Sequence, residues 1–425
     1  MEKSRRAGWA IAAAVVFILS LTLFPTHGQS EPASACLVCG ARGIADALLN
    51  VALFMPLGVA LAYAGLGLVR AVPIGFALTV AVELAQLYVP GRDSSLGDVM
   101  TNTLGTACGV LLLQRAPALL AWARRRAALL SLALPLATLL GLALGAVLLR
   151  PAFPAGPYAP AWHTEASHPI WFGGEVRSAQ LGGLPLLRRR IRDGAGVRSL
   201  WLGGAALRLS VVRAPGPPDL EPVFGLYDAG NRELLLVALE GDDVVFRYRT
   251  TSAAVRLDEP ELHLWGLAPR ATTAGAAAVP SLIELRRQGS GYCLSVDGRG
   301  RCGLGYGLAR SWAVIMYPVL RPAAESVVDL LFLFLLFLPS GMLLRRRTAP
   351  LVLALQLLGL ALIPLAAGLK PTAPPAYLAA VLGLGAGAAL ARALRRLAGA
   401  PQGRASSTPA VMASASAATQ RSMRL

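Results

Sequence analysis

Three pairs of polar residues stand at helical spacing inside apolar stretches of this chain. They are Asp46 and Asn50, Glu83 and Gln86, and Asp98 and Asn102, with Arg92 in the connection between the last two pairs. Residues three or four apart share one face of an α-helix. Carboxylates and amides on such a face can bind the polar part of a ligand or exchange protons with it. In a membrane these side chains are costly, so they need partners or a task.

Membrane-spanning helices are the elements expected to position these pairs. Hydrophobic residues make up 55% of the chain, and stretches near the ~20 residues that cross a bilayer recur along it. They occur at about 8–24, 44–64, 72–89, 95–114, 127–149, 326–344, 349–369 and 376–394. The net charge of +17 does not indicate nucleic acid, because the arginines cluster beside apolar runs rather than among exposed aromatic residues.

The basic residues predict the orientation of these spans. One set flanks alternate span ends and marks the cytoplasmic side by the positive-inside rule. It comprises Lys3, Arg5, Arg6, Arg70, Arg115, Arg124 to Arg126, Arg345 to Arg347, Arg392, Arg395 and Arg396. Both termini are then cytoplasmic. An uncleaved first span is favoured over a signal peptide, because the small residues Ala33-Ser34-Ala35 lie too far beyond Phe24.

A polar region at about 160–320 breaks the membrane pattern with short alternating runs and turn signals, which are typical of an antiparallel sandwich. We therefore expect an α-helical membrane bundle of about eight spans, with an all-β jelly-roll sandwich inserted after the fifth. The expected parts are a five-helix membrane domain at 1–150, an extracytoplasmic sandwich at 151–322, a three-helix membrane block at 323–396 and a disordered cytoplasmic tail at 397–425.

One hairpin of this region can be drawn residue by residue around the turn Asp297-Gly298. Pairing outward from the turn brings Cys293 opposite Cys302 at a non-hydrogen-bonded site, where side chains approach most closely. We predict a disulfide there, since disulfides persist outside the cytoplasm. Cys36 and Cys39 fall in the first outer loop, and the sequence leaves open whether they are bonded.

The strand rhythm, the segment from Glu240 to Arg247 and the turn within Tyr292 to Gly298 resemble the laminin-G-like, concanavalin A-like jelly-roll domains. The resemblance covers about 150 residues and implies glycan binding, in some members with calcium. No calcium site can be assigned, because the candidate acids Asp242, Asp243 and Asp297 sit in turns, where acidic residues are common. The tryptophans at 171, 201, 265 and 312 can stack on sugars, but core packing or membrane contact is the favoured explanation, because tryptophan is usually buried.

The first membrane segments carry a longer pattern, in which further fixed positions accompany the polar pairs. It adds Phe54, Pro56 and Gly58 after the first pair and Gly105 and Gly109 after the third. Together these residues resemble the VanZ-like family, membrane proteins associated with resistance to the glycopeptide teicoplanin. The resemblance spans roughly the first 115 residues. It implies a bacterial cytoplasmic membrane and a role in the cell envelope, but not a defined biochemical activity.

The predicted topology brings all three pairs and Arg92 to the outer leaflet. Gly105 and Gly109 have the spacing that lets helices pack closely, and Pro56 with Gly58 can bend the second span. One interpretation is that the polar groups only tie helices together, at about 0.6 kcal/mol per hydrogen bond. The other is an outward-open polar site for a lipid headgroup or a lipid-linked envelope component. Three acids against one or two arginines favour a protonated carboxyl or a cationic ligand.

The last membrane block repeats part of this pattern. Asp329, Phe337, Pro339 and Gly341 keep the spacing of Asp46, Phe54, Pro56 and Gly58, and Gly383 with Gly387 echoes Gly105 with Gly109. Leu333 stands at the place of Asn50, and nothing matches Glu83, Arg92 or Asp98. We interpret residues 325–395 as a degenerate second copy; chance similarity in a sequence rich in Leu, Gly and Phe is the alternative.

Three functions remain in view. The leading hypothesis is a non-enzymatic envelope protein with a membrane site for a lipid or lipid-linked component and an outer sandwich that binds glycan or a partner. The second is a membrane enzyme using Glu83 or Asp98 as acid or base, against which no nucleophile–base pair is evident and no histidine lies in a span. The third is a scaffold. We expect no cofactor and no metal at the membrane site.

Overall fold

The computed structural model describes most of the 425-residue chain. The described residues are 2–25, 40–92, 94–162, 172, 174–187, 191, 193–214, 220–271, 279–316 and 318–399. Eight helices in this part are long and apolar enough to span a membrane. They are α1 (Glu2–Thr22), α2 (Gly43–Tyr63), α3 (Leu68–Gln86), α4 (Leu96–Arg125), α5 (Ala127–Leu148), α7 (Pro322–Met342), α8 (Ala349–Ala367) and α9 (Pro374–Gly399). The predicted eight-span bundle is confirmed. Cys36, Cys39 and residues 400–425 lie outside the described residues.

Helix α4 is longer than the span expected to end near residue 114. It continues through Pro117 to Arg125, and α5 begins at Ala127. The extension is rich in Ala, Leu and Arg, which favour helix over loop. At 30 residues, α4 measures about 45 Å, so its last turns reach beyond a hydrocarbon core of about 30 Å.

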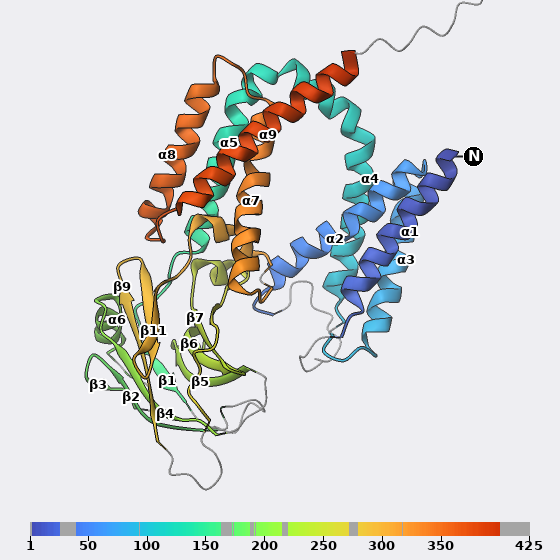
Figure 1. The fold of residues 1–425 in the computed structure, drawn as a ribbon. Coiled ribbons are helices and arrows are strands. Elements are labelled where there is room, and N and C mark those ends of the chain that lie inside the picture. Colours follow the sequence, from blue (N-terminus) through green and yellow to red (C-terminus); the bar gives the residue numbers. More distant parts are fainter. Residues whose placement is uncertain are drawn as a thin grey trace, which may run out of the picture.

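The helices form two groups, which are joined to one β-sandwich (Figure 1). In the first group α2 packs along α4, and α1 and α3 complete the set. In the second group α7 packs along α9, while α5 contacts α7 and α8. The starting end of α1 lies at the end of the bundle away from the sandwich (Figure 1).

The sandwich comprises two antiparallel sheets and lies between α5 and α7 in the chain. One sheet has the order β1-β5-β6-β7-β8 and the other the order β11-β10-β9-β4-β2-β3. The strands are β1 (Ala159–Ala161), β2 (Glu175–Leu181), β3 (Leu184–Pro185), β4 (Leu207–Val212), β5 (Leu220–Tyr227), β6 (Glu233–Glu240), β7 (Asp243–Tyr248), β8 (Leu262–Leu264), β9 (Ser281–Gln288), β10 (Gly291–Val296) and β11 (Arg299–Leu304). A helix, α6 (Gly194–Leu202), and two 3₁₀ turns, η1 (Thr251–Val255) and η2 (Leu308–Val314), accompany them. The predicted insertion of a sandwich after the fifth span is confirmed.

The hairpin β10–β11 has the predicted register near its turn. Val296 pairs with Arg299 and Leu294 with Arg301, and Asp297 takes the left-handed conformation at φ 50°. Cys293 and Cys302 form a disulfide with their Cα atoms 4.0 Å apart, as predicted. One extra residue interrupts the ladder just beyond the disulfide.

One apolar core runs from the sandwich into the second helix group. It joins strand residues such as Phe246 and Tyr292 to Leu142 of α5 and Phe337 of α7. Ala45, at the start of α2, belongs to the same core, whereas the rest of the first group has a core of its own around Phe54. The sandwich therefore fixes the start of α2, on which the polar pattern begins.

Candidate functional site

The three acids of the predicted site lie at neighbouring helix ends in the first group. Asp46 is in the first turn of α2, Asp98 in the first turn of α4, and Glu83 near the end of α3. Asp98 is within electrostatic range of both other carboxylates. Glu83 is buried, Asp98 is half-buried and Asp46 is exposed. We call these three residues the carboxylate cluster.

Glu83 completes the start of α4 from the neighbouring helix. The Ser95 hydroxyl caps α4 by accepting from the Asp98 amide at 3.1 Å, and the Ser95 amide donates to Oε2 of Glu83 at 2.9 Å. In a capping box that amide is bound by the side chain three residues ahead, here Asp98. Because Glu83 takes this place, the Asp98 carboxylate is left to other partners.

Asn50 provides the partner that connects α2 to α4. Its Nδ2 donates to Oδ1 of Asp98 at 2.8 Å. Asp46 lies one turn earlier on α2 and on the same helix face as Asn50, as their spacing predicts. Both residues therefore lie toward the end of the α2–α4 crossing that contains Asp98. The two oxygens of Asp98 can accept more bonds than this one amide supplies.

A second, deeper amide lies one turn below on α4. Nδ2 of Asn102 donates to the Thr79 hydroxyl on α3 at 2.9 Å, and both residues are buried. Within the described part of the chain, Oδ1 of Asn102 has no hydrogen-bond partner. A buried acceptor left unpaired is unfavourable, so this atom is a natural receiver for a donor entering from the carboxylate cluster above.

Gln86 and Arg92 serve a different purpose from the other predicted site residues. Nε2 of Gln86 donates to the Thr22 carbonyl at 3.0 Å, and Arg92 donates to the carbonyls of Leu21 and Phe24 at 2.8 and 2.9 Å. The last carbonyls of a helix have no partner inside that helix. These two side chains therefore attach the end of α1 to the end of α3. The guanidinium of Arg92 binds backbone carbonyls rather than a carboxylate.

The carboxylate cluster consequently brings together more acidic than basic side chains. In the part of the chain that the structure describes, no Lys or Arg forms an ion pair with any of its three acids. Arg42, one turn before Asp46, acts on it through space but is bound to Asp258 of the sandwich at 3.0 Å. Such a cluster suits a cationic group, a hydrogen-bond donor or a shared proton.

The predicted packing residues lie where α2 crosses α4. Phe54 is fully buried and Pro56 stands inside α2. A Cβ on Gly58 would overlap the Thr106 carbonyl, and one on Gly105 or Gly109 would overlap the backbone of α2. Only glycine permits this approach, which positions the two polar helix ends against each other.

The same crossing recurs between α7 and α9. Gly105 lies against the carbonyl of Val51, five residues after Asp46, and Gly383 lies against that of Phe334, five residues after Asp329. The acid of this second crossing is occupied, however. Arg310 of η2 donates to Asp329 at 3.0 and 3.1 Å, and the Trp312 indole donates at 2.8 Å.

Two residues of the site escaped the sequence reasoning, although the chain carries signals for both. Ser95 stands three residues before Asp98, which is the spacing of a helix N-cap. Thr79 stands four residues before Glu83 on the same face of α3. Neither residue could be assigned to the site from the sequence, because Ser95 bonds to Glu83 of α3 and Thr79 bonds to Asn102 of α4.

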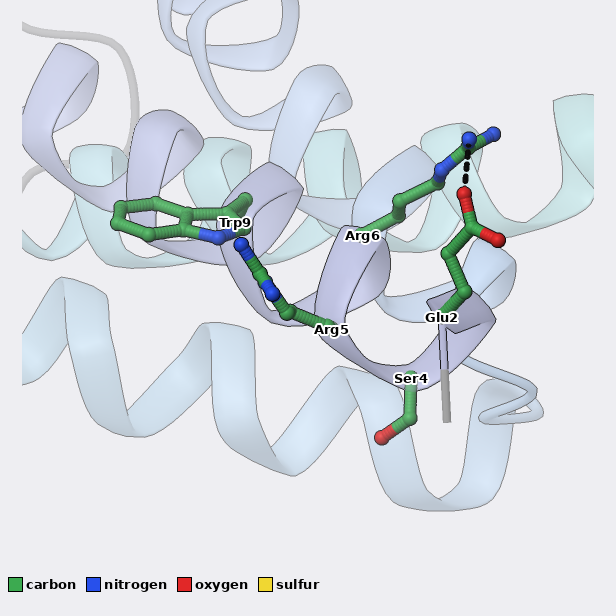
Figure 2. Close-up of a pocket in the computed structure, with 5 residues that line it drawn as sticks. All are labelled: Glu2, Ser4, Arg5, Arg6 and Trp9. Atoms are coloured by element: carbon green, nitrogen blue, oxygen red, sulfur yellow. Dashed lines mark hydrogen bonds and ion pairs between the residues drawn. The ribbon is translucent and has the colours of Figure 1, made fainter.

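In the described part of the chain, the hollow beside α1 and the acids of the sandwich turns show no comparable cluster of polar side chains. A shallow hollow beside the first turns of α1 is lined by residues of that helix alone, and Figure 2 shows the Arg5 side chain beside the Trp9 ring. Arg and Trp at a helix end are typical of a membrane interface anchor. Among the described residues, no three His, Cys, Asp or Glu side chains gather in a way that could hold a metal ion. Asp243 and Asp297 accept bonds from the amides of Gly266 and Leu282.

The sandwich tryptophans are engaged within the protein. Trp201 is buried and stacks on Tyr292 at 5.6 Å between ring centroids. Trp265 lies under the Arg321 guanidinium, and Trp312 is bonded to Asp329. The fourth, Trp171, lies outside the described residues.

The family model described as VanZ/LLP1 matches residues 7–120, which include the carboxylate cluster and the α2–α4 crossing. Comparison with curated proteins and with solved structures found no match.

Proposed function

We propose that the VanZ-like domain at residues 7–120 binds a lipid headgroup or lipid-linked envelope component at the carboxylate cluster without changing it chemically. The observation that carries this proposal is that Asp46, Glu83 and Asp98 gather at one end of the helices and form no ion pair with a basic side chain among the described residues. Ionisable groups inside a membrane protein usually serve function. The ligand would offer hydrogen-bond donors or a cation.

The proposed orientation places the carboxylate cluster and the sandwich outside the cytoplasm and both termini inside it. Its support is the positive-inside rule, since the basic residues of α1 and of the α4–α5 connection lie at the opposite helix ends. In this arrangement the sandwich at 151–322 is the part that meets envelope glycans, as its resemblance to concanavalin A-like domains suggests. A role in teicoplanin resistance follows from the family resemblance alone.

We further propose that residues 323–396 are a degenerate second copy of the membrane domain. Its support is the matching α7–α9 crossing. In both crossings a glycine lies against the carbonyl of the residue five positions after the acid, which is Asp46 in α2 and Asp329 in α7. In this copy the acid is paired within the chain by Arg310. The open carboxylate cluster of the first copy is then not a requirement for folding such a crossing.

Reconstitution into liposomes tests the proposed function. Lipid-linked cell-wall precursors would be supplied to wild type, Glu83→Gln and Asp46→Asn, and Glu2→Gln would be the matched control because Glu2 is an exposed carboxylate at the far end of α1. We expect binding or transbilayer movement at least tenfold weaker in the two site variants and unchanged in the control. A chemically altered precursor would show an enzyme instead, and equal null results for all proteins would leave a scaffold.

A further inference from the structure

A charged cleft separates the start of α2 from the sandwich. It has a volume of about 320 Å³ and is lined by Ala41, Arg42, Arg232, Glu233, Arg247, Arg249, Leu257, Asp258 and Glu259. Four arginines thus face three acids. The cleft lies outside the carboxylate cluster, and the proposed function assigns no role to the individual sandwich residues that line it.

Most of these charges are already paired. Asp258 binds Arg42 at 3.0 Å, Glu233 binds Arg247 at 2.7 Å, and Arg232 binds Asp228, outside the lining, at 2.8 Å. Each of these pairs fixes a wall of the cleft. Two charged residues of the lining, Arg249 and Glu259, are not part of these ion pairs.

Arg249 is the arginine that remains. Its Nη1 donates to the Glu233 carbonyl at 3.4 Å, and within the described residues its side chain forms no ion pair. The remaining acid, Glu259, accepts from the Thr250 amide at 3.0 Å. Burial raises the pKa of Glu259, although the Thr250 bond, Arg249 and Arg247 oppose the rise. Arg249 is therefore the arginine of the lining that forms no ion pair within the described residues, and the carboxyl that acts on it electrostatically is that of Glu259.

The walls are held in place by the junction of α2 with the sandwich. The amides of Ile44 and Ala45 donate to the Arg256 carbonyl at 3.1 and 3.4 Å, so the first free donors of α2 are bound by the sandwich. Because the candidate span begins at Gly43, we expect the cleft to lie near the depth where lipid headgroups meet the hydrocarbon core.

We propose that this cleft binds a phosphate group through Arg249, with Arg232 and Arg42 beside it. Guanidinium groups match the geometry of phosphate oxygens and bind them through paired hydrogen bonds. The volume admits a single phosphate or diphosphate headgroup. That group can belong to an anionic lipid or to a free phosphate ester, and binding does not depend on the carboxylate cluster.

The test uses the full chain, purified in a neutral detergent, with two probes. Inorganic diphosphate is titrated by calorimetry, and retention of phosphatidylglycerol against phosphatidylcholine is counted by native mass spectrometry. Arg249→Gln is the test variant. Arg208→Gln is the matched control, because Arg208 lies on the other sheet and is paired with Glu284 at 3.0 Å.

We expect Arg249→Gln to weaken binding at least tenfold and Arg208→Gln to leave it unchanged. Loss with phosphatidylglycerol alone assigns the site to a lipid headgroup, and loss with diphosphate alone assigns it to a soluble ester. Binding of both probes at wild-type strength by Arg249→Gln overturns the proposal. Arg249→Lys, which keeps the charge, separates lost binding from failure to fold. Glu83→Gln should bind both probes normally, so failure here is distinguishable from failure of the proposed function.

Discussion

Asn50 is the residue that distinguishes ligand binding from helix packing. Its side-chain amide donates a hydrogen bond from α2 to Asp98, whereas Leu333 stands at the corresponding place of α7 and is fully buried. We expect Asn50→Leu to change the free energy of unfolding by about 1 kcal/mol or less, while ligand binding at the carboxylate cluster falls at least tenfold. Thermal unfolding in detergent and the liposome assay measure the two effects.

The reciprocal change Leu333→Asn is the control for Asn50→Leu. It places an amide in the apolar crossing of α7 and α9 and should not create binding there, because Arg310 already occupies Asp329. Wild-type binding by Asn50→Leu would show that Asp98 needs no support from α2.

The surroundings of His263 predict that the stability of the sandwich depends on pH. Its ring nitrogens lie 3.4 Å from Glu261 and 3.5 Å from Glu240, and the ring stacks on Trp265. Burial lowers the pKa of His263, but Glu261, Glu240 and Asp243 outweigh burial and raise the pKa above 6.5. Protonated His263 therefore stabilises the folded sandwich. This contribution is complete below the unfolded-state pKa of about 6.5 and is lost as pH rises through the higher folded-state pKa.

The expected result is a higher unfolding temperature at pH 6 than at pH 8, with a smaller difference in His263→Gln. Tryptophan fluorescence during heating provides the measurement. Because the other three histidines are retained in His263→Gln, the difference between the two proteins isolates this residue. An equal pH dependence in both would contradict the assignment.

Gly387 and Gly385 lie on different faces of α9, and the effect of adding a side chain depends on that face. A Cβ on Gly387 would overlap the Leu338 carbonyl of α7, while a Cβ on Gly385 meets open space. We expect Gly387→Ala to destabilise the chain by about 1–3 kcal/mol and Gly385→Ala to be neutral or to stabilise by up to about 1 kcal/mol. Unfolding in detergent measures both, and equal effects would contradict the close crossing.

Periodicity predicted the helices and the shared face of each polar pair, because both follow from backbone geometry within one segment. It could not predict that Arg92 and Gln86 would bind carbonyls of α1, or that Glu83 would bind the Ser95 amide. Those partners depend on how neighbouring helices rotate about their axes. The end of α4 was missed for a related reason, since hydropathy marks where a span leaves the membrane, not where its helix stops.

The sandwich connects the two helix groups of the whole molecule. It holds α2 through the Arg256 carbonyl, receives α5 through bonds between Arg150 and Thr251, and meets the loop before α9 where the Lys370 amide donates to Tyr306 at 3.0 Å. Direct packing between the groups is slight, since the main helix contacts lie within each group. Binding at the sandwich junction can therefore influence how the two groups are spaced.

The joint between the sandwich and α7 rests on the half-buried pairing of Arg310 with Asp329 and Glu325. Removing one partner of a buried pair leaves an uncompensated charge, whereas replacing both with apolar residues is often close to neutral. Because the pair is half-buried, we expect Arg310→Met to cost about 1–3 kcal/mol, between the values for exposed and fully buried pairs, and to expose the η2–α7 connection to protease. The double variant Arg310→Met with Asp329→Leu should recover more than half of that loss, although Trp312 then loses its acceptor.

Thermal unfolding and limited proteolysis of the three proteins measure this joint. If the double variant were as unstable as Arg310→Met, the charge pair would not be what holds the sandwich to α7. If Arg310→Met were harmless, the guanidinium would be dispensable even though it binds both acids of α7. The expected pattern, loss followed by recovery, would mean that the second crossing tolerates an apolar residue in place of its acid. The exposed Asp46 of the first crossing would then stand out as an acid that packing does not require.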